Sequence, residues 1–473
     1  MGSYTFTNNK LDKNKVFILQ KSEIDKRFDP QFYKQEYKTL LSKIKSKSFK
    51  RLGDIVKFSN ETWNQKDFFE NTFPYIEISE INTLSGEIEN ISETEIGEAA
   101  SRAKMIVRKN DIIISTTRPS RGAIALIKPS QDFSIASTGF SVIRNLKDIE
   151  INRDYLFTVL RQQLVLKQFE QRSSGGNYPA ITQEELSNVI IPKLSSENQK
   201  KIISIFQKTL LEKQQNETEA EKLLASIDTF LLNQLGITLP KHEENTLKSR
   251  MFTTSLKELS SARFDPNYHT KYYKELFKSF EDGKYEYSTI KKYADFQSGY
   301  AFKSTDYLED SNCLLITIKN IRQNQIDINN ATYLPDDFYD IYEDFQIKKD
   351  DLLIAMTGAT IGKVGIYDHE EKSLLNQRNG IIKPTNINSI YLMSLLNLNV
   401  FQSIILRNSN GGAQPNISET DIMKIKIPVP PIVKQIEIAN HITEIRKQAQ
   451  ALKDKTKIAL QKANEEIENL LLY

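Results

Sequence analysis

Two long stretches of the chain carry apolar residues at helical spacing. In residues 197–235 these residues recur mostly at intervals of three or four, and Gly236 follows as a helix stop. The second stretch covers about residues 433–472. A helix of about 39 residues is far longer than the average of 11 or 12 in globular proteins. We therefore expect two amphipathic helices that bury their apolar stripes outside an ordinary globular core.

The most economical partner for each helix is the other one, in an antiparallel coiled coil. The alternative is that each helix folds back onto its own globular domain. Under the coiled-coil interpretation, the interface residues are Ile202, Phe206, Leu210, Leu224, Ile227 and Leu231 in the first helix, and Ile436, Ile442, Ile445, Leu452 and Ile467 in the second.

The region before each helix shows short β-type runs between helical stretches, which predicts a mixed α/β (α+β) globule. In the first half, residues 31–41 and 155–169 have helical spacing, and residues 73–78 and 111–115 resemble strands. In the second half the corresponding segments are 267–277 and 391–406 for helices, and 313–318 and 351–355 for strands.

The chain also contains an internal repeat. Arg27-Phe28-Asp29-Pro30 returns as Arg263-Phe264-Asp265-Pro266, and the Gly175-Gly176 loop returns at Gly411-Gly412, both 236 positions later. This period is far longer than the roughly 20 to 50 residues of solenoid repeats. The repeated unit is therefore a whole domain, and we expect pseudo-twofold symmetry.

These patterns predict five segments. They are a first globular domain (1–194), its helix (195–236), a linker (237–254), a second globular domain (255–429) and a C-terminal helix (430–473).

Composition excludes several protein classes. Of the 473 residues, 39% are hydrophobic and 26% charged, which is typical of a globular protein rather than a disordered one. No apolar run reaches about 18 residues and no secretion signal is visible, so we expect no membrane association and a reducing, cytoplasmic compartment. The single cysteine, Cys313, lies in an apolar run and is interpreted as a buried strand residue.

Charge is unevenly distributed although the net charge is only +3. Residues 98–128 contain seven basic and two acidic residues, whereas the matching window, 338–368, contains three basic and six acidic ones. The basic window could attract phosphates. A solvated basic surface without a ligand is the alternative.

Several repeated motifs occur in the same order in both halves. After the Arg-Phe-Asp-Pro turn come a Lys-x-Asp-Ile/Leu strand, a Gly-Gly-x-x-Pro loop, an Ile-Pro turn and a long helix with a glutamine near its start, Gln199 or Gln435. In this ordered set the chain resembles the DNA-specificity subunit of Type I restriction-modification systems over nearly its whole length. The first copy departs from the pattern at residues 177–180 and 192–195, which affects individual contacts rather than the resemblance.

The resemblance implies two target-recognition domains, each reading one half of a bipartite asymmetric sequence in double-stranded DNA. It also implies that the helices set the spacing between the half-sites and dock two modification (methyltransferase) subunits. ATP-dependent restriction subunits would join them in the full complex.

Motifs for catalysis are missing from the sequence. There is no Gly-x-x-x-x-Gly-Lys-Ser/Thr phosphate loop, no complete dinucleotide fingerprint, no Asn/Asp-Pro-Pro-Tyr run and no paired histidines for zinc. We therefore expect a non-catalytic chain that binds no cofactor or metal, with S-adenosylmethionine bound by the partner modification subunit.

DNA contacts must then come from loops, where arginine can pair with guanine, and asparagine or glutamine with adenine. The candidates in the first domain are Arg118, Ser120, Arg121, Arg172, Asn177 and Tyr178, and those in the second are Thr360, Lys363, Gln377, Arg378, Arg407, Asn410 and Gln414. Two alternatives remain: a two-domain scaffold that binds only proteins, and an unrecognised DNA-modifying enzyme.

Overall fold

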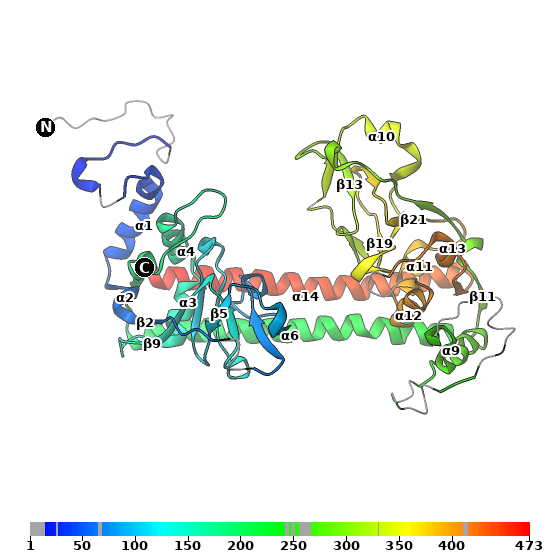
Figure 1. Ribbon diagram of the computed structural model, residues 1–473, viewed down its shortest axis with the longest axis horizontal. Helices are drawn as coiled ribbons and strands as arrows, with labels where there is room; N and C mark the ends of the chain where they lie inside the picture. Colours follow the sequence, from blue (N-terminus) through cyan, green and yellow to red (C-terminus); the bar gives the residue numbers. More distant parts are fainter. Residues whose placement is uncertain are drawn as a thin grey trace. The chain divides into compact units, whose positions relative to one another are not determined.

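The computed structural model describes residues 15–24, 27–64, 69–241, 246, 251–253, 255, 266–329, 331–409 and 415–473. The chain divides into two compact units (Figure 1). Unit 1 combines Met1–Glu217 with Lys453–Tyr473, and unit 2 is Thr218–Leu452. Unit 1 is thus built from both ends of the chain, whereas unit 2 is one continuous stretch.

Unit 1 contains three sheets. Its strands are β1 (Phe49–Arg51), β2 (Val56–Ser59), β3 (Thr72–Ile76), β4 (Ser92–Glu95), β5 (Ala103–Ile106), β6 (Ile112–Ser115), β7 (Ile124–Leu126), β8 (Ile135–Ser137), β9 (Phe140–Leu146) and β10 (Ile190–Pro192). A central sheet has the order β2-β9-β6-β7 and is antiparallel throughout. An outer sheet, β4-β3-β8-β5, contains the parallel pair β3–β8, and β1 pairs with β10.

Unit 2 repeats this plan. Its strands are β11 (Glu286–Thr289), β12 (Ala294–Ser298), β13 (Cys313–Ile316), β14 (Ile321–Arg322), β15 (Gln325–Ile326), β16 (Thr332–Leu334), β17 (Gln346–Ile347), β18 (Leu352–Ala355), β19 (Val364–Ile366), β20 (Lys372–Leu375), β21 (Asn379–Pro384) and β22 (Lys426–Val429). The central sheet is β12-β21-β18-β19, the outer sheet is β16-β13-β20-β17, and β11 pairs with β22. The hairpin β14–β15 has no named counterpart among the described strands of unit 1.

The α-helices precede and follow these sheets. They are α1 (Gln35–Lys45), α2 (Leu52–Ile55), α3 (Arg153–Leu160), α4 (Gln163–Arg172), α5 (Gln183–Ser187) and α6 (Ser196–Leu235), then α9 (Lys271–Glu281), α10 (Phe338–Ile341), α11 (Ser389–Leu396), α12 (Asn399–Asn408), α13 (Glu419–Met423) and α14 (Ile432–Leu472). Each of the predicted helical stretches 155–169 and 391–406 is two helices rather than one. The second pair is bent by 71°.

Alternating side chains of the central strands separate two layers of core. In β6, Ile112 and Ile114 pack with the helices, whereas Ile113 faces the outer sheet. Leu353 of β18 likewise faces the outer sheet of unit 2, while Leu352 packs with the helices. Because both faces of the central sheet are buried at β6 and β18, these two strands read as apolar runs.

Among the described helices, no single one is long and apolar enough to cross a membrane. Together, α11 and α12 reach such a composition only as a bent pair, and their apolar residues lie in the core of unit 2.

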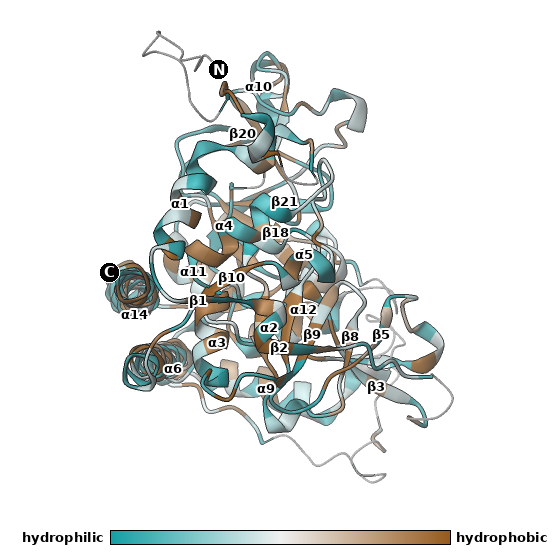
Figure 2. Cartoon of the chain, turned by 90° about the vertical axis from the view of Figure 1, so that its left-hand side faces the viewer, coloured by the Kyte–Doolittle hydropathy of each residue, from teal (hydrophilic) through white to brown (hydrophobic). Residues whose placement is uncertain are grey.

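The two long helices, of 40 and 41 residues, pair side by side as predicted (Figures 1 and 2). In unit 1 the first half of α6 contacts the last part of α14, as in the buried hydrogen bond of 3.2 Å from Asn216 Nδ2 to Thr456 Oγ1. In unit 2 the second half of α6 meets the first part of α14, where the rings of Phe230 and His441 lie 4.1 Å apart. The pairing is therefore antiparallel.

The apolar stripes also pack on the globular parts of each unit. Ile202, Phe206 and Ile467 lie in the core of unit 1, and Ile227, Leu231, Ile442 and Ile445 in that of unit 2, while Leu210 and Leu452 are half-buried. The long helices therefore serve both as partners for each other and as one wall of each core.

Two of the expected interface residues need correction. Leu224 and Ile436 are 36% and 44% exposed. The adjacent Leu223 packs against the core, and Gln435 is buried. In a paired helix, inward-facing positions are separated alternately by three and by four residues. If a spacing of four is assumed where the helix has a spacing of three, the expected interface residue is displaced by one position.

Candidate nucleic-acid interface

Two loops of unit 1 join at the end of strand β6. One connects β6 to β7 and contains the 3-10 turn Pro119–Arg121, and the other is the Gly-Gly loop between α4 and α5. The amide of Arg118 donates to the Pro179 carbonyl at 2.7 Å, and the amide of Ile181 donates to the Thr116 carbonyl at 2.9 Å. The predicted candidates on these loops therefore belong to one surface.

The side chain of Arg118 strengthens this junction. Its Nη2 lies 3.0 Å from the Asn177 carbonyl, and its guanidinium stands 4.3 Å above the Tyr178 ring. Tyr178 is 71% exposed, so this stacked pair faces solvent. Arg121 is also exposed, Ser120 is half-buried, and the structure shows no ion pair for Arg121 with any described residue.

Arg172 lies beneath this surface in an ion pair. Its Nη1 contacts a carboxylate oxygen of Glu185 at 2.8 Å. Arg27 of the Arg-Phe-Asp-Pro turn donates to the carbonyls of Arg172 and Ser173 at 2.8 and 3.2 Å, and it pairs with Asp29 at 2.8 Å. The Arg-Phe-Asp-Pro turn therefore holds the segment that leads into the Gly-Gly loop. These contacts favour a structural role for Arg172.

Unit 2 joins the corresponding loops in the same way. The amide of Gly358 donates to the Pro415 carbonyl at 3.0 Å, and that of Ile417 donates to the Met356 carbonyl at 3.0 Å. The candidates Asn410 and Gln414 lie outside the described residues.

The remaining candidates of unit 2 differ in exposure. Gln377 and Arg378 are exposed in the β20–β21 connection, whereas Thr360 and Lys363 are half-buried in the β18–β19 connection. Arg407 donates twice to the Tyr268 carbonyl, at 2.6 and 2.9 Å, and stacks 3.5 Å from its ring. Gln171 holds the Phe32 carbonyl at the corresponding place in unit 1. Arg407 is therefore engaged in fastening the start of unit 2.

Three of the seven basic residues in the basic window of unit 1 pair with carboxylates. Arg102 pairs with Glu77 at 2.9 Å, Lys128 with Glu87 at 3.3 Å, and Arg108 with Glu61 at 2.7 Å. Lys104 and Lys109 have no ion pair with a described residue. The window thus contributes less free positive charge than its composition suggests.

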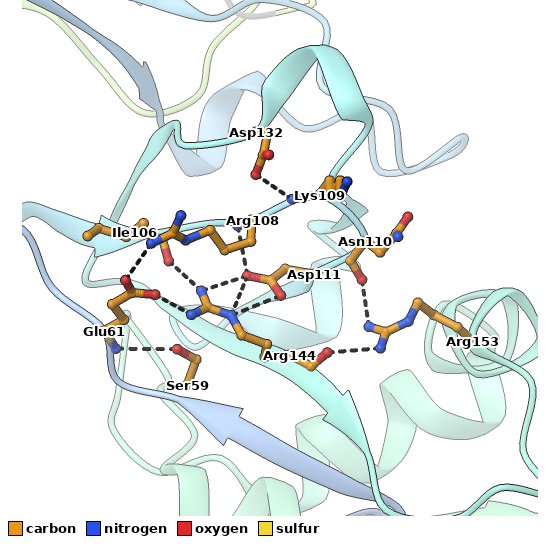
Figure 3. A network of polar contacts seen from close by, with 10 residues as sticks. All are labelled: Ser59, Glu61, Ile106, Arg108, Lys109, Asn110, Asp111, Asp132, Arg144 and Arg153. Atoms are coloured by element: carbon orange, nitrogen blue, oxygen red, sulfur yellow. Dashed lines mark hydrogen bonds and ion pairs between the residues drawn. The ribbon is translucent and has the colours of Figure 1, made fainter.

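Figure 3 shows the network to which Arg108 belongs. Glu61 accepts hydrogen bonds from Arg108 and Arg144, and these hold the pKa of Glu61 below its ordinary value. Arg144 also pairs at 2.9 Å with Asp111, whose side chain is almost fully buried. These side chains link strands of both sheets and are not available to a ligand without breaking ion pairs.

Both halves of the chain match the model of one protein family, described as the Type I restriction modification DNA specificity domain, over residues 44–229 and 282–462. The chain belongs to this family. Its role is DNA recognition in a Type I restriction-modification system, as the resemblance of its motifs predicted.

The chain is similar to proteins named as specificity subunits of Type I restriction enzymes. The Type I restriction enzyme MjaVIII specificity subunit of Methanocaldococcus jannaschii is 26% identical over 93% of this chain and 96% of its own length. The HindI specificity subunit of Haemophilus influenzae is 27% identical over 34% of this chain and 32% of its own. A solved chain from a type I R-M system shares 19% identity, with 90% of this chain and 96% of that chain covered, at a TM-score of 0.47.

Among the described residues, no group of three or more His, Cys, Asp or Glu side chains could hold a metal ion. Cys313 is fully buried in β13, and burial raises the pKa of its thiol to about 11, as suits a core residue. The glycine-containing residues 357–362 form the connection between β18 and β19.

Proposed function

We propose that each unit reads one half of a bipartite asymmetric sequence in double-stranded DNA. The observation that carries this proposal is the repeated loop junction, because the same two hydrogen-bonded loops occur at β6 and at β18. The side chains at and beside these junctions differ. In unit 1 the junction presents Arg118 and Tyr178, whereas in unit 2 the adjoining β20–β21 connection exposes Gln377 and Arg378. Different side chains would read different half-sites.

The chain itself would be non-catalytic. Methyl transfer would come from two modification subunits that bind S-adenosylmethionine, and DNA cleavage from ATP-dependent restriction subunits. The missing catalytic motifs support this division of labour. The purified chain alone should therefore transfer no methyl group to DNA, whereas the complex with the modification subunit should.

The decisive experiment expresses the full chain with its modification subunit in a host that lacks other DNA methylation, followed by sequencing of the modified bases. A bipartite motif with two unlike halves is expected. Replacing Arg121 and Tyr178 together by alanine should alter the first half and leave the second unchanged. Altered preference in both halves would contradict the assignment of one half-site to each unit.

DNA binding is tested separately from methylation. Affinity of the chain for a mixed-sequence duplex should fall as salt rises, because phosphate contacts release counterions. The absence of any salt-dependent binding, alone or with the modification subunit, would favour the protein-only scaffold.

A further inference from the structure

Two arginines have a backbone conformation that arginine seldom adopts. Six non-glycine residues of the described chain have positive φ, and three of them, Asn110, Asn324 and Asp350, are of the types that tolerate it. Arg118 (φ 48°) and Arg378 (φ 68°) are not. Such strain persists where the surrounding structure imposes it, and it clusters at functional sites.

Both arginines lie at the same edge of their central sheets. The residue after β6, Thr116, donates its amide to the Gly139 carbonyl at 2.7 Å. The residue after β18, Met356, donates to the Arg378 carbonyl at 2.9 Å. Arg378 therefore occupies the place of Gly139.

In the loop that follows the central strand, β6 or β18, unit 1 has the arginine and unit 2 has the glycine. Arg118 and Gly358 both follow the central strand by three residues, and each donates its amide to a proline carbonyl of the Gly-Gly loop. Both have positive φ. Each unit thus has one arginine and one glycine at this edge, with their places exchanged.

Both guanidinium groups can face a ligand. Arg378 is exposed, and the structure shows no hydrogen bond or ion pair of its side chain with any described residue. Arg118 is half-buried, donates to the Asn177 carbonyl at 3.0 and 3.3 Å and stacks on the exposed ring of Tyr178, and these contacts fix its direction. The two arginines therefore differ in how far they are preorganised.

We propose that Arg118 and Arg378 are specificity-determining residues, each reading a guanine in its half-site. An arginine fork matches the O6 and N7 acceptors of guanine in the major groove, and no other base offers that pair. A strained backbone that aims such a fork would account for an arginine where glycine would fit without strain. This inference rests on the proposed function of the two units.

The test uses the full chain with its modification subunit and compares the methylated motifs of wild type, R118K, R378G and R378K. In R378G, discrimination for one guanine of the second half should fall by roughly 5- to 150-fold, while the first half is unchanged. R118K keeps the positive charge but loses the two-pronged guanidinium. It should lower discrimination for one guanine of the first half by a similar factor. The control D350G replaces another exposed residue with positive φ and should leave the motif unchanged.

Thermal unfolding distinguishes recognition from a structural role. R378G relieves the strain without removing a side-chain contact, so its melting temperature should not fall below that of wild type. A fall would assign Arg378 a structural role and overturn the proposal for unit 2.

The methylation pattern supplies the other outcomes. A second half-site without any G·C pair, or a uniform loss over all sequences in R378G and R378K, would also overturn it, since uniform loss indicates a phosphate contact. A wild-type complex that methylates without a bipartite motif would instead refute the proposed function itself.

Discussion

The two units agree next to the long helices and differ in the outer part of each globule. Tyr155 donates to the Pro192 carbonyl at 2.7 Å, and Tyr391 donates to Pro428 at 2.8 Å in the same place. By contrast, Glu61 after β2 holds two arginines, whereas Tyr300 after β12 packs among aromatic rings. The repeat thus retains the contacts that attach a globule to its helix. Rings pack in the outer part of both units, around Trp63 and Phe73 in unit 1, but in unit 1 the ion pairs of Glu61 with two arginines are added to them.

Removing a ring from the aromatic cluster of unit 2 should have the largest effect on stability. Phe302 is 6% exposed and lies 5.0 Å from the rings of both Tyr300 and Tyr342. Phe302→Ala should lower the free energy of unfolding by about 3 to 5 kcal/mol, since it leaves a cavity. Denaturant unfolding of the full chain measures this, with the exposed Lys303→Ala as control. A loss below about 1 kcal/mol would show that the rings do not hold the outer sheet.

Two equivalent aspartates should respond differently. Asp111 and Asp351 each accept a hydrogen bond from the amide three residues earlier, but only Asp111 has an ion pair among the described residues, with Arg144. Asp111→Asn should cost about 2 kcal/mol, because it weakens charged hydrogen bonds of a partly buried guanidinium. Asp351→Asn should cost nothing at pH 7, because burial already raises the pKa of Asp351. Equal losses in thermal unfolding would contradict the comparison.

The carboxylates of Glu61 and Asp351 should make stability depend on pH in opposite directions. The lowered pKa of Glu61 means that its contribution to stability is present above the ordinary glutamate pKa of about 4.3 and is lost as pH falls through the lowered value. The raised pKa of Asp351 means that its contribution is present at lower pH and lost as pH rises through the raised value. The free energies of unfolding of E61Q, D351N and the wild type, measured from pH 3 to 7, give the contribution of each carboxylate.

The shared contacts should give equal effects. Gln199 accepts from the Asn152 amide at 2.9 Å, and Gln435 accepts from the Asn388 amide at 2.9 Å. Replacing either glutamine by leucine leaves a backbone amide without its partner, which should cost about 1 to 3 kcal/mol. The two losses should agree within about 0.5 kcal/mol in matched unfolding experiments. Clearly unequal losses would show that the two units share their backbone plan but not the energetic role of these glutamines.

The smallest effect concerns DNA binding. Arg121 is exposed beside Ser120, whereas the corresponding turn of unit 2 carries the uncharged Thr360. If Arg121 contacts a phosphate, Arg121→Ala should reduce the slope of log affinity against log salt by about 1, and Thr360→Ala should not change it. A change of specificity in Arg121→Ala with an unchanged slope would identify a base contact instead.

Much of the fold could be predicted from the sequence, because the repeat marks two copies of one plan and the apolar runs mark strands and long helices. The break between α3 and α4 was missed, since residues 155–169 keep helical spacing across Arg161 and Gln162 although the backbone of Gln162 is extended. The prediction that Leu224 and Ile436 face the helix interface was wrong, because inward-facing positions assigned with one spacing are displaced by one residue where the spacing changes.

The candidate site was less predictable. The loops could be chosen from their position after strands, but the engagement of Arg172 and Arg407 with the start of each unit depends on contacts between residues more than 130 positions apart. The positive φ of Arg118 and Arg378 was also invisible, because arginine is not a residue that marks such turns. The Arg-Phe-Asp-Pro turn holds the Gly-Gly loop through hydrogen bonds of Arg27 to residues about 145 positions away, which the sequence does not reveal.

The composition of unit 1 from both ends of the chain has a consequence for synthesis on the ribosome. Ile467 and Leu471 are buried in the core of unit 1, and the Glu468 carboxylate accepts from the Leu164 amide at 3.1 Å. At about 5 to 20 residues per second, translation of the intervening Thr218–Leu452 takes on the order of 10 to 50 s. During that interval the nascent first globule lacks one wall of its core, so unit 2, the later to be translated, is the first whose residues are all present.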